Sequence, residues 1–247
     1  MDHMTEQVAL ITGGAKGIGR GIALDLASRQ WNIAFCYRTS EAEAKSTAQD
    51  IAQRGGQALA LRCDVSDPLA AKHMVAQIEK EWRQIDVLIN GAGPYHRVNL
   101  FDETIEGWNE MFDANLHPIF YLAQAVAPGM KARKAGRIIS FGMANADQME
   151  AQADVTAHYI AKAGVLILTR TLAKLLAPYG ITGNAISPGF IDSGSAPPQE
   201  LAAMAKRIPA GYIGTVDDTV AAVRYLLSEE ARYVNGANIQ ISGAWGI

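Results

Sequence analysis

Cysteine, net charge and long apolar runs are all scarce in this chain, and each scarcity excludes a class of protein. Only Cys36 and Cys63 occur among the 247 residues. Their spacing suits no metal site, so we expect two buried, small apolar side chains in a reducing compartment. The formal net charge of -3 does not indicate a basic surface that would bind nucleic acid or an anionic membrane. No apolar run approaches the roughly 18 residues that span a bilayer.

Internal repeats, blocks of like charge and abrupt changes of composition are also missing, which favours a single domain. A length of 247 residues with 49% hydrophobic residues fits one α/β domain. Residues 1–4 resemble a cloning remnant that ends at a native start, Met4, so the domain is expected to cover 5–247. No charged-then-apolar leader is visible, and the sequence therefore predicts a cytoplasmic protein.

What the chain does contain is a regular alternation of short β-type runs and longer helical patterns. Strands are expected at 7–11, 32–37, 58–62, 87–90, 137–141, 182–187 and 238–241. Helices are expected at 18–29, 41–54, 67–83, 104–130, 156–177 and 217–228. Alternating βα units imply parallel strands with helices on both faces. The sequence therefore predicts an α/β fold with a Rossmann-like, doubly wound parallel sheet of about seven strands.

One irregular stretch interrupts this alternation near the carboxyl end of the chain. Residues 187–207 are rich in Gly, Pro and Ser and contain a short helical piece at 198–206. In a doubly wound sheet, a long segment after the carboxyl end of a strand is a good candidate for a substrate lid. We therefore interpret 190–207 as a lid.

A glycine-rich motif stands between the first predicted strand and the first predicted helix. The apolar run Val8–Ile11 leads into Thr12–Gly19, and Ile18, Ile22 and Leu26 then recur at helical spacing. Such a turn lets backbone N–H groups and a helix N-terminus approach a pyrophosphate without obstruction by side chains. Because the glycines lie between strand and helix, they indicate a dinucleotide site more specifically than a glycine triplet alone.

Several further motifs carry a resemblance to one family. Thr12–Gly19 matches the TGxxxGxG pattern of the short-chain dehydrogenase/reductase family, and Asn90–Gly93 resembles its NNAG motif. Asn115 falls at the position of an active-site asparagine of the family, and Pro188–Ser193 resembles its segment beside the nicotinamide carboxamide. The motifs occur in the expected order essentially from end to end. The chain therefore resembles this family, and in particular its 3-oxoacyl-ACP reductases.

The resemblance, together with the positive charges of Lys16 and Arg38, predicts which residues contact the cofactor. They are Gly13, Lys16, Gly17, Ile18, Gly19, Arg38, Asp64, Val65, Asn90, Ala92, Gly93, Lys162, Pro188, Gly189, Ile191 and Ser193.

The end of the second strand bears on the choice between NAD and NADP(H). Sites that prefer NAD usually have a carboxylate there, which accepts hydrogen bonds from the ribose hydroxyls. Here no acid precedes Glu41, whereas Arg38 could pair with a 2′-phosphate and Lys16 could add a second positive charge. The alternative is that both are solvated surface cations. The sequence favours NADP(H).

The pattern departs from the family at the reacting centre. The family's chemistry rests on a serine, a tyrosine and a lysine, the last two spaced Y-x-x-x-K. Lys162 matches the lysine, but His158 stands four residues before it, and Met143 stands where the serine is expected. Tyr159 follows, although one residue along a helix rotates a side chain by roughly 100°. The resemblance implies Asn115 and Lys162 as catalytic residues, together with His158 or Tyr159.

Whether His158 can donate a proton depends on its surroundings. A free imidazolium has a pKa near 6.5 and could act as an acid at neutral pH. Lys162 one turn away and an oxidised nicotinamide would both oppose that charge. A carboxylate would have to compensate, either Asp154, if the helix begins early enough, or Asp147 or Glu150 in the preceding loop. Alternatively, a local change at the helix start could bring Tyr159 into the pocket.

Three functions remain open on these grounds. The first is an NADPH-dependent reductase that transfers hydride to a small or medium organic substrate, most often a carbonyl compound, with a non-standard proton donor. The second is a reductase of conjugated alkenes or imines, similar to pteridine-type members of the family, which needs no tyrosine acid. The third is a catalytically silent nucleotide-binding subunit.

The substrate is expected to bind in an apolar, adaptable pocket that contains a few polar side chains. Its candidate residues are Tyr95, His96, Met143, Met149 and Phe190. Met149 could equally be a residue of loop packing. His96 is a candidate second acid, and the alternative is an exposed loop histidine without a role.

Two predicted helices are apolar beyond a single stripe. These are 104–130 and 156–177, and such width suggests that one side covers the sheet while the other meets a second subunit. In the resembled family these helices commonly form a dimer face, which implies a homotetramer, with a dimer as the second choice.

Overall fold

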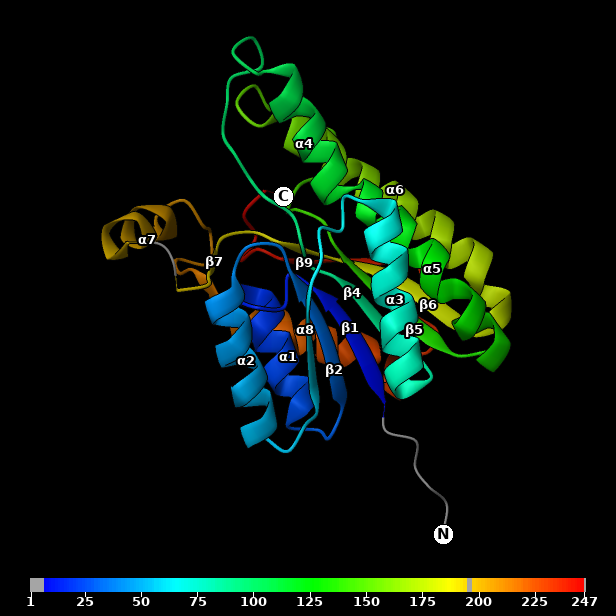
Figure 1. Ribbon diagram of the computed structural model, residues 1–247. Coiled ribbons are helices and arrows are strands. Elements are labelled where there is room, and N and C mark those ends of the chain that lie inside the picture. The colour runs from blue at the N-terminus through cyan, green and yellow to red at the C-terminus, as the bar shows by residue number, and fades with distance from the viewer. Residues whose placement is uncertain (1–6, 195–196, 247) are drawn as a thin grey trace.

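The structure is a computed structural model that describes residues 7–194 and 197–246 (Figure 1). The segment 1–4, expected to be a cloning remnant, lies outside the described residues. Seven parallel strands form one sheet in the order β3-β2-β1-β4-β5-β6-β9. The strands are β1 (Val8–Thr12), β2 (Asn32–Tyr37), β3 (Ala58–Arg62), β4 (Val87–Asn90), β5 (Gly136–Phe141), β6 (Ile181–Pro188) and β9 (Asn238–Ile241). The predicted doubly wound α/β fold is confirmed.

Helices cover both faces of the sheet (Figure 1). The layer on one face consists of α1 (Gly17–Ala27), α2 (Glu41–Gln53) and α8 (Val216–Leu227). The layer on the other face consists of α3 (Pro68–Trp82), α5 (His117–Arg133) and α6 (Thr156–Leu176). Short 3-10 turns, η1 (Ala177–Tyr179) and η2 (Glu229–Ala231), lead into β6 and toward β9. Among the described helices, none has the length and apolar character needed to cross a bilayer.

The sheet separates two hydrophobic cores, because neighbouring side chains on a strand point to opposite faces. In β1, Ala9 and Ile11 pack with α1 and α8, whereas Val8 and Leu10 pack with α3 and α5. All four side chains are almost fully buried. A strand buried on both faces reads as a continuous apolar run, which is why the strands were visible in the sequence.

The predicted helix 104–130 is wrong in one respect, because it is two helices. The first, α4 (Ile105–Asn115), ends at Leu116, and α5 begins at the next residue. Pro118 lies in the first turn of α5 and has no N–H to donate to the carbonyl group four residues earlier, that of Ala114. The break frees the end of α4, so that Asn115 and Ala114 face the region of the site.

The segment interpreted as a lid extends to one side of the sheet (Figure 1). Its described part contains β7 (Ile191–Asp192) and α7 (Pro198–Ala205). The strand β7 pairs with β8 (Gly214–Thr215), just before α8. This small second sheet ties the start of the segment to the body of the fold, and α7 extends beyond it.

Candidate active site

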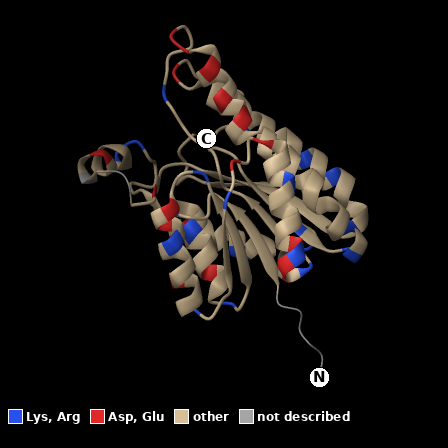
Figure 2. Ribbon diagram, in the orientation of Figure 1, with Lys and Arg blue, Asp and Glu red and all other residues tan. Residues whose placement is uncertain are grey.

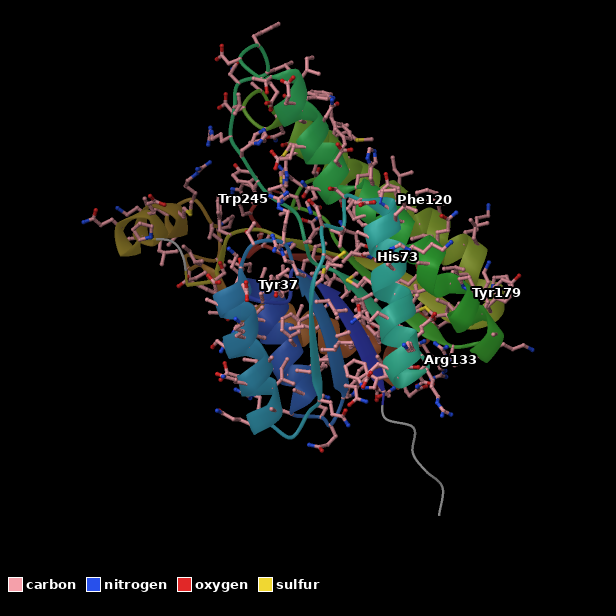
Figure 3. The ribbon with its side chains drawn as sticks, in the orientation of Figure 1. Tyr37, His73, Phe120, Arg133, Tyr179 and Trp245 are labelled. Carbon is pink, nitrogen blue, oxygen red and sulfur yellow. The ribbon has the colours of Figure 1, made fainter. Side chains whose placement is uncertain are left out.

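A cleft of about 780 Å³ lies at the carboxyl ends of the strands. Its walls are the segments that follow β1, β2, β3, β4 and β6, together with Ala114 of α4. All the predicted cofactor positions line the cleft except Asn90 and Lys162, which are buried next to it. Tyr37 also lines it (Figure 3) and was missed, although it directly precedes the predicted contact Arg38. The carboxyl edge of a doubly wound sheet is where such folds bind ligands.

The glycine turn fits a pyrophosphate because the backbone approaches closely there. Gly13 and Gly17 have φ of 69° and 56°, in the region that favours glycine. An added Cβ on Gly13 would meet Ala92 Cα at 3.1 Å, and one on Gly19 would collide with the carbonyl oxygen of Gly13. The N-terminus of α1 opens directly onto the cleft at Gly17. The turn therefore presents backbone N–H groups and the positive end of a helix, rather than side chains, to a ligand in the cleft.

Positive charge lies at the end of the cleft beside β2. Arg38 is exposed, and its guanidinium nitrogens lie 3.9 Å from Asp64 and 3.9 Å from Glu110. Figure 2 shows acidic positions along α4, the helix that carries Glu110. Lys16 is exposed in the glycine turn and lines the same cleft. Two long cations can therefore reach a ligand at this end.

Lys162 lies on α6 with its side chain directed toward the sheet. It is 8% exposed, and Nζ donates to the carbonyl oxygen of Phe141 at 2.8 Å. Burial lowers the pKa of Lys162 to about 8. An added Cβ on Gly93 would meet Nζ at 3.6 Å, so the ammonium lies directly behind the cleft wall.

Two buried asparagines adjoin Lys162. Asn115 Nδ2 donates to the carbonyl oxygen of Pro94 at 3.1 Å, and Asn90 Nδ2 donates to Ser140 Oγ at 3.3 Å. In the described part of the chain, neither Oδ1 atom has a hydrogen-bond partner. A bound ligand or an ordered water molecule can supply the missing donors.

His158 lies one turn before Lys162 and is 6% exposed. Burial, then the charge of Lys162, then that of His96 lower the pKa of His158 to about 3, and a hydrogen bond to the Pro94 carbonyl group opposes them only weakly. Its ring is therefore neutral at pH 7. A neutral imidazole can donate a hydrogen bond, but it is a far weaker acid than an imidazolium.

The carboxylates expected to compensate a charge on His158 have other partners. Asp154 lies before the start of α6, and it accepts a hydrogen bond from Arg97 Nη2 at 2.8 Å. Asp147 accepts from Gln240 Nε2 at 3.2 Å, which ties its loop to β9. The condition for support of His158 by Asp154 is not met, because α6 begins two residues after Asp154.

Tyr159 points away from the cleft and holds the loop that precedes α6. Its hydroxyl donates to the carbonyl oxygen of Asn145 at 2.6 Å and accepts from the backbone N–H of Glu150 at 3.1 Å. The Glu150 carboxylate accepts from Asn145 Nδ2 at 3.5 Å. The hydroxyl of Tyr159 is therefore fully engaged with this loop rather than with the site.

The five residues expected around the substrate do not all lie at the site. Tyr95 is 60% exposed and meets His158 edge-on, with ring centroids 5.1 Å apart. The ring centroids of Phe190 and Trp245 are 4.7 Å apart, and Trp245 also lies close to the cleft residue Gly189. Met143 packs instead into a small buried cluster behind the site, and Met149 is 74% exposed on a loop. The structure thus brings Tyr95 and Phe190, but not the two methionines, to the edge of the site.

An interaction that the sequence did not reveal joins two residues of the loop after β4. His96 Nε2 lies 2.8 Å from Glu103 Oε2, and the Glu103 side chain is only 10% exposed. The two residues are seven positions apart in an irregular segment, so no periodicity indicated the pair.

Both cysteines are buried and free, as expected. Burial raises the pKa of Cys36 to about 12 and that of Cys63 to about 11, which leaves both as unreactive thiols. No group of three metal-ligating side chains converges within residues 7–194 and 197–246.

A doubly wound sheet, a glycine turn opening onto helix α1 and a buried lysine behind the cleft define the class of Rossmann-type oxidoreductases. Comparison with known proteins narrows this class. The family described as enoyl-(acyl carrier protein) reductase matches residues 13–244. A 3-oxoacyl-(acyl-carrier-protein) reductase, FabG, from Staphylococcus epidermidis is 34% identical over 244 residues, covering 95% of this chain and 97% of the relative. The chain belongs to the short-chain dehydrogenase/reductase family.

Solved structures agree with this assignment. A short-chain dehydrogenase/reductase variant from Serratia marcescens is similar with a TM-score of 0.90 and 27% identity, covering 99% of this chain and 100% of that one. A blue fluorescent protein from a metagenomic library, in complex with NADPH, has a TM-score of 0.90 and 29% identity over 100% of both chains.

Proposed function

We propose that this oxidoreductase is an NADPH-dependent reductase that transfers hydride to a small or medium organic substrate, a carbonyl compound first of all. The observation that carries the proposal is the convergence of Lys162, Asn115 and His158 at the end of a cleft whose other end holds Arg38 and Lys16. When bound, the reduced nicotinamide supplies the hydride. The chain's own residues would bind and orient the reactants and deliver a proton.

Each residue has a role that its contacts support. The Lys162 ammonium would orient the nicotinamide ribose, because it lies directly behind Gly93. Asn115 would support a relay of water or backbone groups through its unpartnered Oδ1 atom. His158 would occupy the position that the family gives to tyrosine, and because its single N–H is bonded to the Pro94 carbonyl group, its unpartnered Nδ1 atom would accept a hydrogen bond from the substrate or a water molecule.

NADPH is favoured over NADH because β2 is followed directly by Arg38 rather than by a carboxylate, and Lys16 lines the same cleft. The fold neighbour that holds NADPH adds to this preference. In Arg38→Gln, the Kd for NADPH should rise about 10- to 100-fold, as expected for one charge-assisted contact, while the Kd for NADH changes little. Arg29→Gln, two residues past the end of α1 and outside the cleft lining, serves as the control and should leave both values unchanged. An equal loss of affinity for both cofactors would contradict a 2′-phosphate contact.

A second candidate acceptor is an imine or a conjugated alkene, and the neutral state of His158 favours it. Hydride addition to an iminium ion needs no proton at the reacting atom, and addition to a conjugated alkene depends less on a fixed acid. A buried imidazole with a pKa of about 3 suits such acceptors better than it suits a ketone, unless another side chain supplies the proton.

The deciding experiment measures NADPH oxidation with ketones, activated alkenes and cyclic imines, and NADPH binding in parallel. Turnover of ketones supports the first proposal. Turnover of alkenes or imines alone supports the second candidate. Binding of NADPH without turnover of any acceptor would instead support a catalytically silent nucleotide-binding subunit.

A further inference from the structure

The loop after β4 holds an imidazole next to a carboxylate. His96 Nε2 and Glu103 Oε2 are 2.8 Å apart, with the two side chains 30% and 10% exposed. A largely buried carboxylate in this position accepts a hydrogen bond from Nε2 and fixes the orientation of the ring. The remaining exposure of His96 leaves a route for solvent protons to the ring.

This loop is held against the segment that leads into α6. The backbone N–H groups of Val98 and Leu100 donate to the carbonyl oxygens of Asp154 and Ala153 at 2.8 and 2.9 Å. Arg97 adds an ion pair with the Asp154 side chain at 2.8 Å. These contacts fix the loop relative to the helix that carries the reacting centre.

His96 lies near the site but differs from His158 in its surroundings. Its neighbour Tyr95 packs edge-on against the His158 ring, and Pro94, one residue earlier, lines the cleft. A charge on His96 is also one of the causes that lower the pKa of His158. The site therefore holds one buried, neutral imidazole and one imidazole paired with an acid, Glu103.

We propose that His96, held by Glu103, is the acid that donates the proton in the reduction proposed above. The hydride, with its electron pair, forms the new C–H bond at the carbonyl carbon, and the reduced cofactor becomes NADP⁺. The carbonyl oxygen takes the proton from Nδ1 of His96, because Nε2 faces Glu103. Solvent then restores the proton to the imidazole. This inference rests on the proposed carbonyl reduction and names the donor for it.

The test compares pH profiles of kcat/KM in the full-length protein, with a ketone acceptor, across roughly pH 5 to 9, where imidazole titrates. The groups facing His96 are Glu103 and His158, with the Arg97–Asp154 pair next along the loop. Wild-type activity should fall as pH rises, because His96 loses its proton. Glu103→Ala should lower kcat/KM, since the ring loses the hydrogen bond that orients it.

Three further variants separate a chemical role from a structural one. His96→Asn should lower kcat about 10²- to 10⁴-fold and remove the pH-dependent fall, with the Kd for NADPH unchanged. In His96→Gly, added imidazole should restore part of the activity. His117→Asn is the matched control, because His117 also lies 2.8 Å from a carboxylate, Asp113, but on an exposed face, and it should behave like wild type.

A failure of His96 as the proton donor can be told apart from a failure of the proposed carbonyl reduction. If His96→Asn keeps kcat/KM within about threefold of wild type and retains the pH profile, the inference is overturned and the reductase function stands. The same follows if His158→Gln, rather than His96→Asn, removes the pH-dependent fall. If the wild type binds NADPH but reduces no carbonyl compound, the proposed carbonyl reduction fails and the inference fails with it.

Discussion

Buried polar atoms gather around the reacting end of the cleft without protein partners. Among the described residues they include Asn90 Oδ1, Asn115 Oδ1 and His158 Nδ1. Leaving a buried polar atom unpaired costs about 1–3 kcal/mol of stability. Such a concentration in one place is typical of a site that gives up stability in order to bind and orient a ligand.

The neutral state of His158 predicts a loss of stability in acid. The unfolded chain protonates this ring near pH 6.5, whereas the folded chain does so only near 3. The unfolded state therefore binds more protons in this interval, and the free energy of unfolding falls as pH falls below 6.5. Between about pH 7.5 and 5, His158 alone should remove about 2 kcal/mol.

Urea unfolding at the two pH values measures this effect. His158→Gln should lose about 2 kcal/mol less than wild type on acidification. The exposed His73 on α3 (Figure 3) provides a control, because His73→Gln should lose as much as wild type. Equal losses in wild type and His158→Gln would show that the ring takes up its proton at the same pH in the folded and the unfolded chain.

At the scale of elements, Tyr159 connects helix α6 to the loop before it. The hydroxyl is shared between the carbonyl group of Asn145 and the N–H group of Glu150, and Asp147 joins the same loop to β9. The start of α6 and the loop therefore form one unit. This unit sets the position of His158, and within it the Tyr159 hydroxyl is bonded to the loop.

Tyr159→Phe should therefore act on stability more than on the chemical step. Two backbone groups lose their partner at a cost of about 1–3 kcal/mol, and Tm should fall by roughly 2–10 °C. With the variant kept below its Tm, kcat should stay within about tenfold of wild type. Tyr225→Phe, at a half-exposed position on α8, controls for loss of a hydroxyl. A much larger fall in kcat with no change in Tm would instead identify Tyr159 as the proton donor.

Sequence patterns predicted most elements to within a residue or two, and β2, β3, β4 and β9 at their observed bounds. Strands buried on both faces are continuous apolar runs, which makes them easy to find. The break at Leu116 was missed because the helical pattern continues on both sides, and only Pro118 marks it. The side chain of Tyr159 and the pairing of His96 with Glu103 depend on how loops meet, which no periodicity encodes.

At the scale of the whole molecule, α5 and α6 carry large apolar side chains on their outer surface. Phe120, Ile167 and Leu175 are 50%, 59% and 62% exposed, and Figure 3 shows Phe120 and Tyr179 on the outer side of this layer. Large exposed apolar side chains on one helical layer are typical of an interface. We propose that these faces join copies of the chain into a homotetramer, with a dimer as the second choice.

Light scattering tests this assembly. The wild type should have about four times the chain mass of 26.5 kDa, and Ile167→Lys should give a smaller assembly, because a buried unpaired charge is costly. Leu69→Lys changes an apolar side chain on α3 that is 66% exposed and should leave the mass unchanged. A monomeric wild type would contradict the proposed interface.

The tilted packing of Trp245 against Phe190 has an optical consequence. An added Cβ on Gly189 would lie 3.5 Å from the Trp245 ring, so an indole adjoins the wall of the cleft (Figure 3). Reduced nicotinamide absorbs light in the range in which tryptophan emits, and energy passes efficiently between such groups when they are close. The protein thus carries its own fluorescent reporter, whose emission should dim as NADPH fills the cleft and recover as the nicotinamide is oxidised.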